Sequence, residues 1–361
     1  MVRTITTVVL PLLGYLCFLL SAKILGRKVV IFHLPMIGEL PYILPLMERL
    51  SHTRGYAVGL ACSEYPENIA ALKVYLDQET CRRRVHLTDA RFVDLFGSLA
   101  DLYVTAEQFH PTPSQIYSIC IFHGQPSKGI TFSPAVLQYF DNFFFIGPLH
   151  RRALDRFIRH NRDVEYLPKI FEAGYPKTDA LFDDTYDRKT ILAGLRMDST
   201  LPTILYAPAF NEYATLRTIG AELIETIISI EGVNLIIKLA PDSIRTNNNI
   251  YATGGISWND RLVRFTGERC RIAGDLDINP FLVAADIMVT DVSGVAWDFH
   301  LLGKPVIYYD CPEFYERYIT RYDETLSQKE FLGDDSINAG RNYGTVVGSL
   351  DALKCELSAF V

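Results

Sequence analysis

The sequence predicts an α/β protein made of two Rossmann-like domains that face each other across a cleft. Short apolar runs alternate with helix-like patterns and turn residues along most of the chain, which is typical of parallel sheets covered by helices. The alternation begins at Val29 and starts again after Arg188. The length of 361 residues also favours two domains, because a single core rarely grows past about 250–300 residues.

Residues 1–27 predict a separate hydrophobic helix that anchors the chain to a membrane. The uncharged run from Ile5 to Ala22 would form a helix about 27 Å long, close to the thickness of a bilayer core. Lys23, Arg27 and Lys28 follow this run, and positive charges there favour the cytoplasmic face of the cell membrane for the rest of the chain. A cleaved signal peptide and a helix packed on the protein itself are the alternatives.

The first Rossmann-like domain is expected over residues 28–185. Its helices are expected at Leu40 to Leu50 and at Leu149 to Ile158. Its strands are expected at Val29 to Phe32, Ala57 to Leu60, Leu102 to Thr105, Ile116 to Phe122, Phe143 to Ile146 and around Ile170.

The second domain is expected over residues 186–345, after a linker near Asp183 to Lys189. Its helices are expected at Leu216 to Ile230 and Val295 to Leu302, and a last helix within residues 346–361 is expected to pack back on the first domain. Its strands are expected at Ile204 to Ala207, Leu235 to Leu239, Leu262 to Phe265, Ile287 to Val289 and Val306 to Tyr309.

Composition argues against several classes of partner and cofactor. The net charge of −7 and the pI near 5.7 argue against nucleic acid, which requires a concentrated basic surface. The seven cysteines are scattered and form no CxxC pair, so we expect reduced thiols and no structural zinc. The acidic pairs Asp183-Asp184 and Asp334-Asp335 stand in turn-like sequence, which indicates solvated carboxylates and not a metal site. We therefore expect no metal and no cofactor.

A turn in the second domain predicts a site for phosphate groups. An apolar run ends at Asp291, and a short helix begins near Val295. Free backbone N–H groups at that helix end, together with the Ser293 hydroxyl, would bind phosphate oxygens, and Gly294 would let a ligand approach the backbone. Asp298, one helical turn later, would accept hydrogen bonds from a ribose. The alternative is an ordinary strand–helix unit capped by Ser293.

A histidine at the end of a strand in the first domain is the second candidate. His123 is followed by Gly124, and the side chain at such a strand end points into the crevice where α/β sheets bind ligands. An imidazole titrates near neutral pH and suits removal of a proton from a hydroxyl group. Lys128 would balance phosphate charge. The alternative is a histidine that binds a loop carbonyl.

Five segments form an ordered set along the chain: His123 to Lys128, Gly174 to Asp179, Leu205 to Pro208, Ile236 to Pro241 and Asp286 to Pro305. In this order, they resemble the CDP-glycerol glycerophosphotransferase family, the teichoic acid and capsule polyol-phosphate transferases. The resemblance extends from about Ile116 to Tyr318. It implies a GT-B fold and transfer of a polyol phosphate from a CDP-activated donor to an acceptor hydroxyl, commonly on a lipid-linked saccharide, with release of CMP.

The resemblance also implies roles for individual residues. His123 would take the acceptor proton, and Lys128 or Lys238 would stabilise the developing negative charge; this arrangement requires no metal ion. The donor would be bound by Gly124, Tyr206, Pro208, Asp291, Ser293, Gly294, Val295 and Asp298.

The sequence departs from the family pattern, which makes the chain a divergent member. Ala240 stands where the family has histidine, so a side chain expected to bind the donor phosphates is missing. Asn211 replaces an arginine, and Gly294 replaces a serine. Two alternatives therefore stay open. One is another GT-B nucleotide-sugar enzyme, either a glycosyltransferase or similar to the UDP-N-acetylglucosamine 2-epimerases; the other is a non-catalytic GT-B module.

Overall fold

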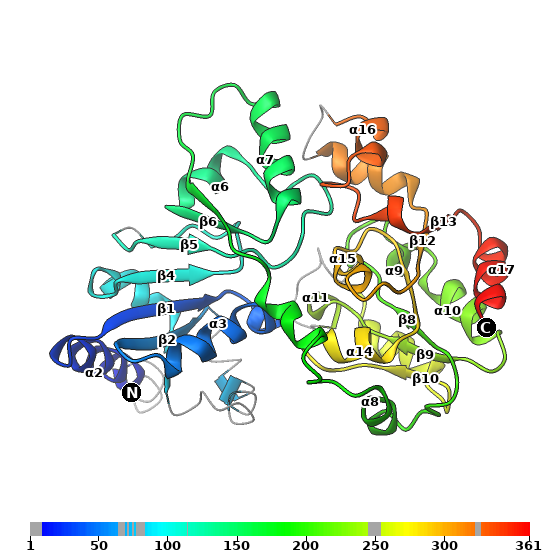
Figure 1. The fold of residues 1–361 in the computed structure, drawn as a ribbon, viewed down its shortest axis with the longest axis horizontal. Coiled ribbons are helices and arrows are strands. Elements are labelled where there is room, and N and C mark those ends of the chain that lie inside the picture. Colours follow the sequence, from blue (N-terminus) through cyan, green and yellow to red (C-terminus); the bar gives the residue numbers. More distant parts are fainter. Residues whose placement is uncertain are drawn as a thin grey trace. The chain divides into compact units, whose positions relative to one another are not determined.

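The chain divides into two compact units. The first unit contains residues 1–123, 132–151 and 157–177, and the second contains residues 124–131, 152–156 and 178–361 (Figure 1). The sequence placed a single boundary near residue 185, whereas the loop 124–131 clusters with the second unit. The computed structural model describes residues 9–63, 69–70, 72–73, 76, 84–113, 115–244, 254–321 and 326–361.

The first unit is built on a seven-stranded parallel sheet with strand order β3-β2-β1-β4-β5-β6-β7. Its strands are β1 (Lys28–Leu34), β2 (Tyr56–Cys62), β3 (Val85–Asp89), β4 (Leu102–Thr105), β5 (Ser118–Cys120), β6 (Asn142–Phe145) and β7 (Lys169–Glu172). Its helices include α2 (Leu10–Ile24), α3 (Leu40–His52), α5 (Ala90–Phe96), α6 (Pro134–Tyr139) and α7 (Pro148–His160).

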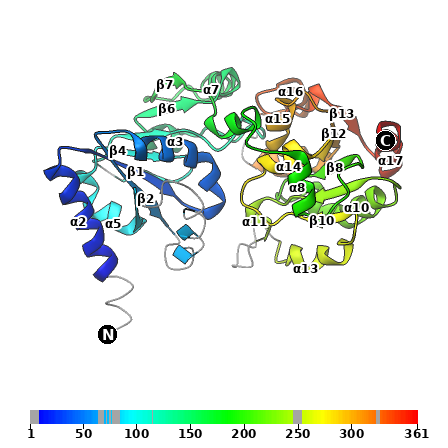
Figure 2. The ribbon, with the colours of Figure 1, turned by 60° about the horizontal axis from the view of Figure 1, so that its bottom comes forward.

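The apolar run of β1 is continuous because both faces of this sheet are covered. Val30 and Phe32 pack with α3 on one face. Val29 and Ile31 pack with α2 and α5 on the other. Figure 2 shows α3 on one side of the sheet and α2 and α5 on the other. Alternating side chains of one strand thus enter two different cores.

The second unit is built on a six-stranded parallel sheet with strand order β10-β9-β8-β11-β12-β13. Its strands are β8 (Thr203–Tyr206), β9 (Asn234–Ile237), β10 (Cys270–Ile272), β11 (Ile287–Thr290), β12 (Val306–Tyr309) and β13 (Thr345–Val347). Its helices include α8 (Arg188–Gly194), α9 (Thr215–Thr218), α10 (Gly220–Ile228), α11 (Pro241–Ile244), α13 (Trp258–Leu262), α14 (Asn279–Ala284), α15 (Val295–His300), α16 (Gln328–Gly333) and α17 (Leu350–Phe360).

The predicted α/β fold with two parallel sheets is confirmed, but one predicted strand is wrong. Leu262 ends the helix α13, and a short 3-10 turn, Val263–Phe265, follows it. Trp258 and Leu262 are one helical turn apart, and both are buried in the core of the second unit. This apolar run is therefore the end of a helix, and the next strand along the chain is β10.

The N-terminal hydrophobic helix differs from the predicted membrane span. One face of α2 packs on the first sheet through Tyr15, Leu19 and Ala22. Among the described residues, no helix is both long and apolar enough to cross a bilayer. The start of the predicted run, at Ile5, lies outside the described residues. The inner face of α2 thus follows the alternative of a helix packed on the protein.

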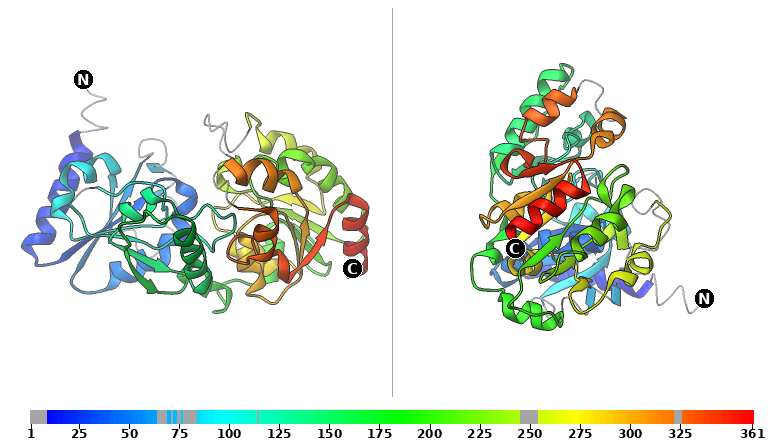
Figure 3. Two further views of the ribbon diagram at one scale, coloured as in Figure 1. Left: turned by 90° about the horizontal axis from the view of Figure 1, so that it is seen from above. Right: turned by 90° about the vertical axis from the view of Figure 1, so that its right-hand side faces the viewer.

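The last helix, α17, contributes to the core of the second unit. Leu353 and Leu357 enter that core beside Leu223 and Ile227 of α10, and the packing of this helix on the first domain stays a prediction. Figure 3 shows α17 lying along α10. α17 thus covers part of the apolar face of α10.

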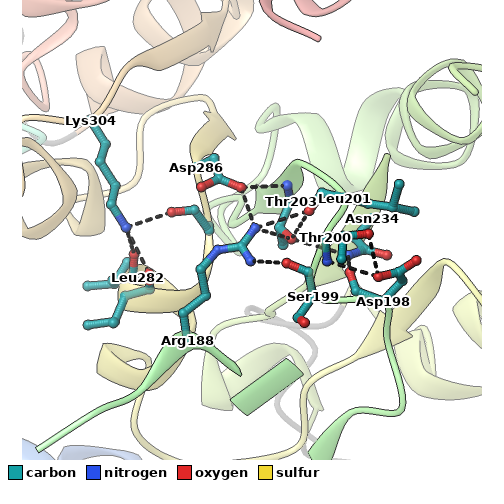
Figure 4. A network of polar contacts seen from close by, with 12 residues as sticks. Arg188, Asp198, Ser199, Thr200, Leu201, Thr203, Asn234, Leu282, Asp286 and Lys304 are labelled. Carbon is teal, nitrogen blue, oxygen red and sulfur yellow. Dashed lines mark hydrogen bonds and ion pairs between the residues drawn. The ribbon is translucent and has the colours of Figure 1, made fainter. Parts of the chain in front are cut away.

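The amino edge of the second sheet is held by a polar network (Figure 4). Arg188 donates to the Asp286 carboxylate at 2.6 Å, and Asp286 also accepts the backbone N–H of Thr203 at 2.8 Å. The Lys304 ammonium donates to three carbonyl oxygens at the end of α14, at 2.7, 2.8 and 3.0 Å. These contacts join the start of α8, the strands β8 and β11 and the end of α14.

Candidate functional site

The carboxyl edge of the second sheet gathers candidate residues from three segments. Tyr206 ends β8, Lys238 directly follows β9, and Asp291 directly follows β11. These strands are adjacent in the order β9-β8-β11. Ligands of open α/β sheets bind beyond the carboxyl ends of the strands, so this edge is the candidate donor site.

Asp291 holds the loops that form this edge. Its buried carboxylate accepts the backbone N–H groups of Ala209 at 2.9 Å, Thr215 at 2.8 Å and Val292 at 2.6 Å, and also the Thr215 hydroxyl at 2.6 Å. The fully buried Tyr206 hydroxyl lies 2.9 Å from the same Thr215 hydroxyl. Asp291 and Tyr206 therefore shape the site through the protein's own loops.

Lys128 is an enclosed cation at the same edge. Its ammonium donates to the Asn211 side-chain oxygen at 2.7 Å and lies 5.3 Å from the centre of the Phe210 ring. Asn211 is itself held by the Tyr318 hydroxyl at 2.7 Å. Burial lowers the pKa of Lys128 to about 8, and the charge of Asp291 partly opposes this shift. One neutral acceptor uses one of three ammonium hydrogens, so Lys128 retains donors for a ligand.

The loop of Lys128 lies directly against the predicted phosphate turn. A β-carbon added at Gly294 would be 3.2 Å from the Ser127 hydroxyl oxygen and 3.7 Å from the Gln125 carbonyl oxygen. Gly294 is the cap residue of α15, and no side chain caps that helix. Ser293 therefore does not cap this helix, and the alternative of an ordinary strand–helix unit stays open. The glycine leaves room for the loop, so residues 124–128 of the first motif lie against the motif 286–305.

The other predicted donor-binding residues differ in their access to solvent. Ser293 and Val295 are half-buried, while Pro208 is buried. Asp298 is 5 % exposed, which leaves little surface for contact with a ribose. Lys238 is 3 % exposed, and its ammonium donates to the Leu239 carbonyl at 3.0 Å. Their roles in donor binding stay predictions.

His123 lies at the carboxyl edge of the sheet of the first unit. Its Nδ1 is 3.2 Å from the Ala106 carbonyl oxygen. A carbonyl only accepts, so Nδ1 carries the hydrogen of this bond, and the lone pair of the neutral imidazole would then lie on Nε2. The Glu107 carboxylate lies 3.9 Å from Nδ1. The alternative of a histidine bound to a loop carbonyl thus holds for Nδ1, and the role of Nε2 as a base stays a prediction.

The backbone just before His123 is strained. Phe122 has a φ of 58°, a conformation that bulky residues rarely adopt. Its ring is fixed among aromatic neighbours, with ring centres 4.5 Å away at His150 and 5.2 Å away at Phe143. This packing stabilises the turn that directs His123 away from the strand.

Sequence reasoning missed Glu107 and a second histidine at this edge. Glu107 follows β4 by two residues, so the strand-end rule that found His123 would also have found it. His33 lies near the end of β1, with Nε2 2.8 Å from the Ser63 hydroxyl. Burial lowers the pKa of His33 to about 3, helped by His110 nearby. Its imidazole is therefore neutral at physiological pH.

The acidic pairs bind neighbouring groups. Asp183 accepts the backbone N–H of Thr185, and Asp334 accepts the backbone N–H of Ser336. Asp335 accepts the Tyr343 hydroxyl at 2.7 Å. Within the part of the chain that the structure describes, no group of three or more histidine, cysteine, aspartate or glutamate residues is placed to hold a metal ion.

The family match found by comparison with known proteins lies mostly within the second unit. Residues 156–329 match the family model of CDP-glycerol:poly(glycerophosphate) glycerophosphotransferase. His123 lies before this matched range. A teichoic acid glycerol-phosphate primase of Bacillus subtilis (strain 168) is 27% identical over 145 residues, which are 39% of this chain and 33% of the primase. The chain thus covers about a third of the length of that relative.

Two solved structures of the wall teichoic acid polymerase TagF share the fold. One has a TM-score of 0.57 at 15% sequence identity, and a variant of it has a TM-score of 0.59 at 14% identity. Each comparison covers 99% of this chain and 86% of the polymerase chain. The predicted resemblance is confirmed, in that residues 156–329 match the model of the CDP-glycerol:poly(glycerophosphate) glycerophosphotransferase family.

Proposed function

We propose that this protein transfers a polyol phosphate, glycerol phosphate or similar, from a CDP-activated donor to a hydroxyl group of a membrane-linked glycan or polymer acceptor. CMP is the second product, and the reaction takes place at the cytoplasmic face of the cell membrane. The family match over residues 156–329 supports the donor class. The observation that carries the proposal is the enclosed Lys128 ammonium on the loop that packs against the Gly294 turn.

In the proposed reaction, Nε2 of His123 takes the proton of the acceptor hydroxyl. The hydroxyl oxygen then attacks the β-phosphorus of the donor, and the bond from this phosphorus to the bridging oxygen breaks, so CMP leaves. Glu107, 3.9 Å from Nδ1, stabilises the imidazolium that forms. Proton removal by a positioned base typically contributes about 10²–10⁴-fold to the rate.

The second unit supplies the charge that the reaction needs. Lys128 and the backbone N–H groups of the Ser293 to Val295 turn would bind the diphosphate, whose charge rises on the leaving CMP. Asp291 contributes indirectly, because it holds the loops after β8 and β11 in place. A fixed cation and fixed amides require no rearrangement during the reaction.

Isothermal titration with CDP, CMP, UDP and GDP tests this proposal without knowledge of the acceptor. We expect cytidine nucleotides to bind best and Ser293→Ala and Asp298→Ala to weaken their binding by about tenfold each. Ser199→Ala, at the opposite edge of the second sheet, is the matched control and should leave binding unchanged.

Two results would contradict the proposal. Selective binding of UDP would favour another nucleotide-sugar enzyme on the same scaffold. Absence of nucleotide binding by folded protein would favour a non-catalytic module, for which the loss of a histidine at Ala240 already gives a reason.

A further inference from the structure

A pocket of about 950 Å³ lies at the amino edge of the first sheet. It is bordered by the end of α2, the turn between α3 and β2, and the start of β3. The candidate catalytic residues of this unit lie at the carboxyl edge of the same sheet, so the pocket is a separate feature. Its volume is in the range of sites that bind small molecules or lipid headgroups.

The pocket is positively charged although the protein is acidic. Arg27, Arg54 and Arg84 line it, and no acidic residue is among its described lining residues. None of these three arginines forms an ion pair with a described residue. The nearby Lys23 and Lys28 differ, since both bind Asp101, at 2.8 and 3.1 Å. The guanidinium groups of the pocket are therefore available to an anion.

An exposed apolar stripe on α2 runs toward this pocket. Leu10, Leu13, Leu20 and Ile24 are 51–85% exposed, and their spacing places them on one face of the helix. The opposite face is the one buried against the first sheet. Leu25, which follows the stripe, lines the pocket. Packing against the described residues does not explain this outward face.

We propose that the pocket binds the phosphate of an anionic phospholipid headgroup while the α2 stripe enters the interfacial region of the same bilayer. Arginine guanidinium groups bind phosphate oxygens in pairs, and apolar side chains beside them suit the acyl boundary. This inference rests on the proposed membrane location but not on the transfer reaction.

A simpler account of the arginines must be separated from this one. α2 ends at Ile24 and α3 ends at His52, and basic residues near helix ends stabilise the helix dipole. That account predicts a change in folding stability when the arginines are neutralised and no change in affinity for lipid. A binding measurement therefore distinguishes the two accounts.

The test is co-sedimentation of the full chain with vesicles of phosphatidylcholine, with or without 30 mol% phosphatidylglycerol. We expect binding to the anionic vesicles, reduced about fivefold for each arginine neutralised and on the order of a hundredfold in the triple variant Arg27→Gln/Arg54→Gln/Arg84→Gln. The matched control is Arg159→Gln/Arg162→Gln/Lys169→Gln, which removes three exposed positive charges of the same unit and should change binding by less than about threefold. Single variants replace the triple variant if its melting shows that it does not fold.

Three outcomes would overturn the inference. Equal losses in the pocket and control variants would show that only total charge matters. Unchanged binding in the pocket variants would leave the helix-dipole account. Release of the wild-type protein from vesicles by millimolar glycerol phosphate would identify a site for soluble phosphate esters. Titration of the same pocket variants with CDP is expected to be normal, so failure of lipid binding and failure of the proposed reaction are distinguishable.

Discussion

The two ends of strand β11 carry the same kinds of residue for different purposes. Asp286 directly precedes this strand and Asp291 directly follows it. Each carboxylate accepts backbone N–H groups of neighbouring segments. A lysine lies near each of them, Lys304 at the amino edge and Lys128 at the carboxyl edge.

The two edges differ in how many ammonium hydrogens each lysine donates to groups of the protein itself. Lys304 donates to three carbonyl oxygens (Figure 4), which equals the number of hydrogens on its ammonium. Lys128 donates to Asn211 alone among the described residues. The amino edge is thus complete as a structure, whereas the carboxyl edge retains capacity to bind an anion.

The largest expected difference is between substitutions of the two aspartates, and Asp291 has the larger effect. Asp291→Ala leaves three buried backbone N–H groups without an acceptor, so we expect it to lower the free energy of unfolding by about 3 kcal/mol or more. It should also weaken CDP binding on the order of a hundredfold, because the loops that hold the site move. Urea unfolding and isothermal titration measure the two effects.

Asp286→Ala is the matched change at the amino edge. Its carboxylate is about one-third exposed and pairs with Arg188, so we expect a stability loss of about 1 kcal/mol. CDP affinity should stay within about twofold of wild type, because the site lies at the other end of the strand. Similar losses of affinity in both variants would mean that the two edges are not functionally distinct.

The sequence predicted the strands better than it predicted the contacts at their ends. Val306 to Tyr309 was located at its observed bounds, because a continuous apolar run marks a strand buried on both faces. β13 was missed because it is short and mostly exposed. The bond between Lys128 and Asn211 joins residues 83 positions apart, and no local pattern records such a pairing. Glu107 was within reach of the strand-end rule, but only His123 was selected.

The second expected effect separates the two lysines. Lys128→Met should reduce the rate of CMP release from CDP-glycerol by about a hundredfold, because an enclosed cation facing the diphosphate is lost. The free energy of unfolding of Lys128→Met at pH 7 should rise, because burial disfavours the charged amine that this substitution removes.

Lys304→Met should instead lower stability and leave activity unchanged. It leaves the last carbonyl groups of α14 without their donor, so we expect a stability loss of about 1–3 kcal/mol and a normal specific activity of the folded fraction. Thermal melts and CMP release measured on both variants provide the comparison. A Lys128→Met protein with normal activity would remove Lys128 from the proposed site.

The smallest effect is the pH dependence that Lys128 imposes. Its pKa is lowered from 10.5 to about 8, so donor affinity should fall above pH 8, by up to about tenfold per pH unit. Between pH 8 and 10.5 the unfolded chain binds more protons at this lysine than the native state, so the contribution of Lys128 to stability rises with pH. Affinity and stability should therefore change in opposite directions, which rules out unfolding as the cause of weaker binding. In Lys128→Arg the charge persists, so its affinity should stay level over this range. A wild-type affinity that stays flat from pH 7 to 10 would show that the Lys128 charge does not contact the donor.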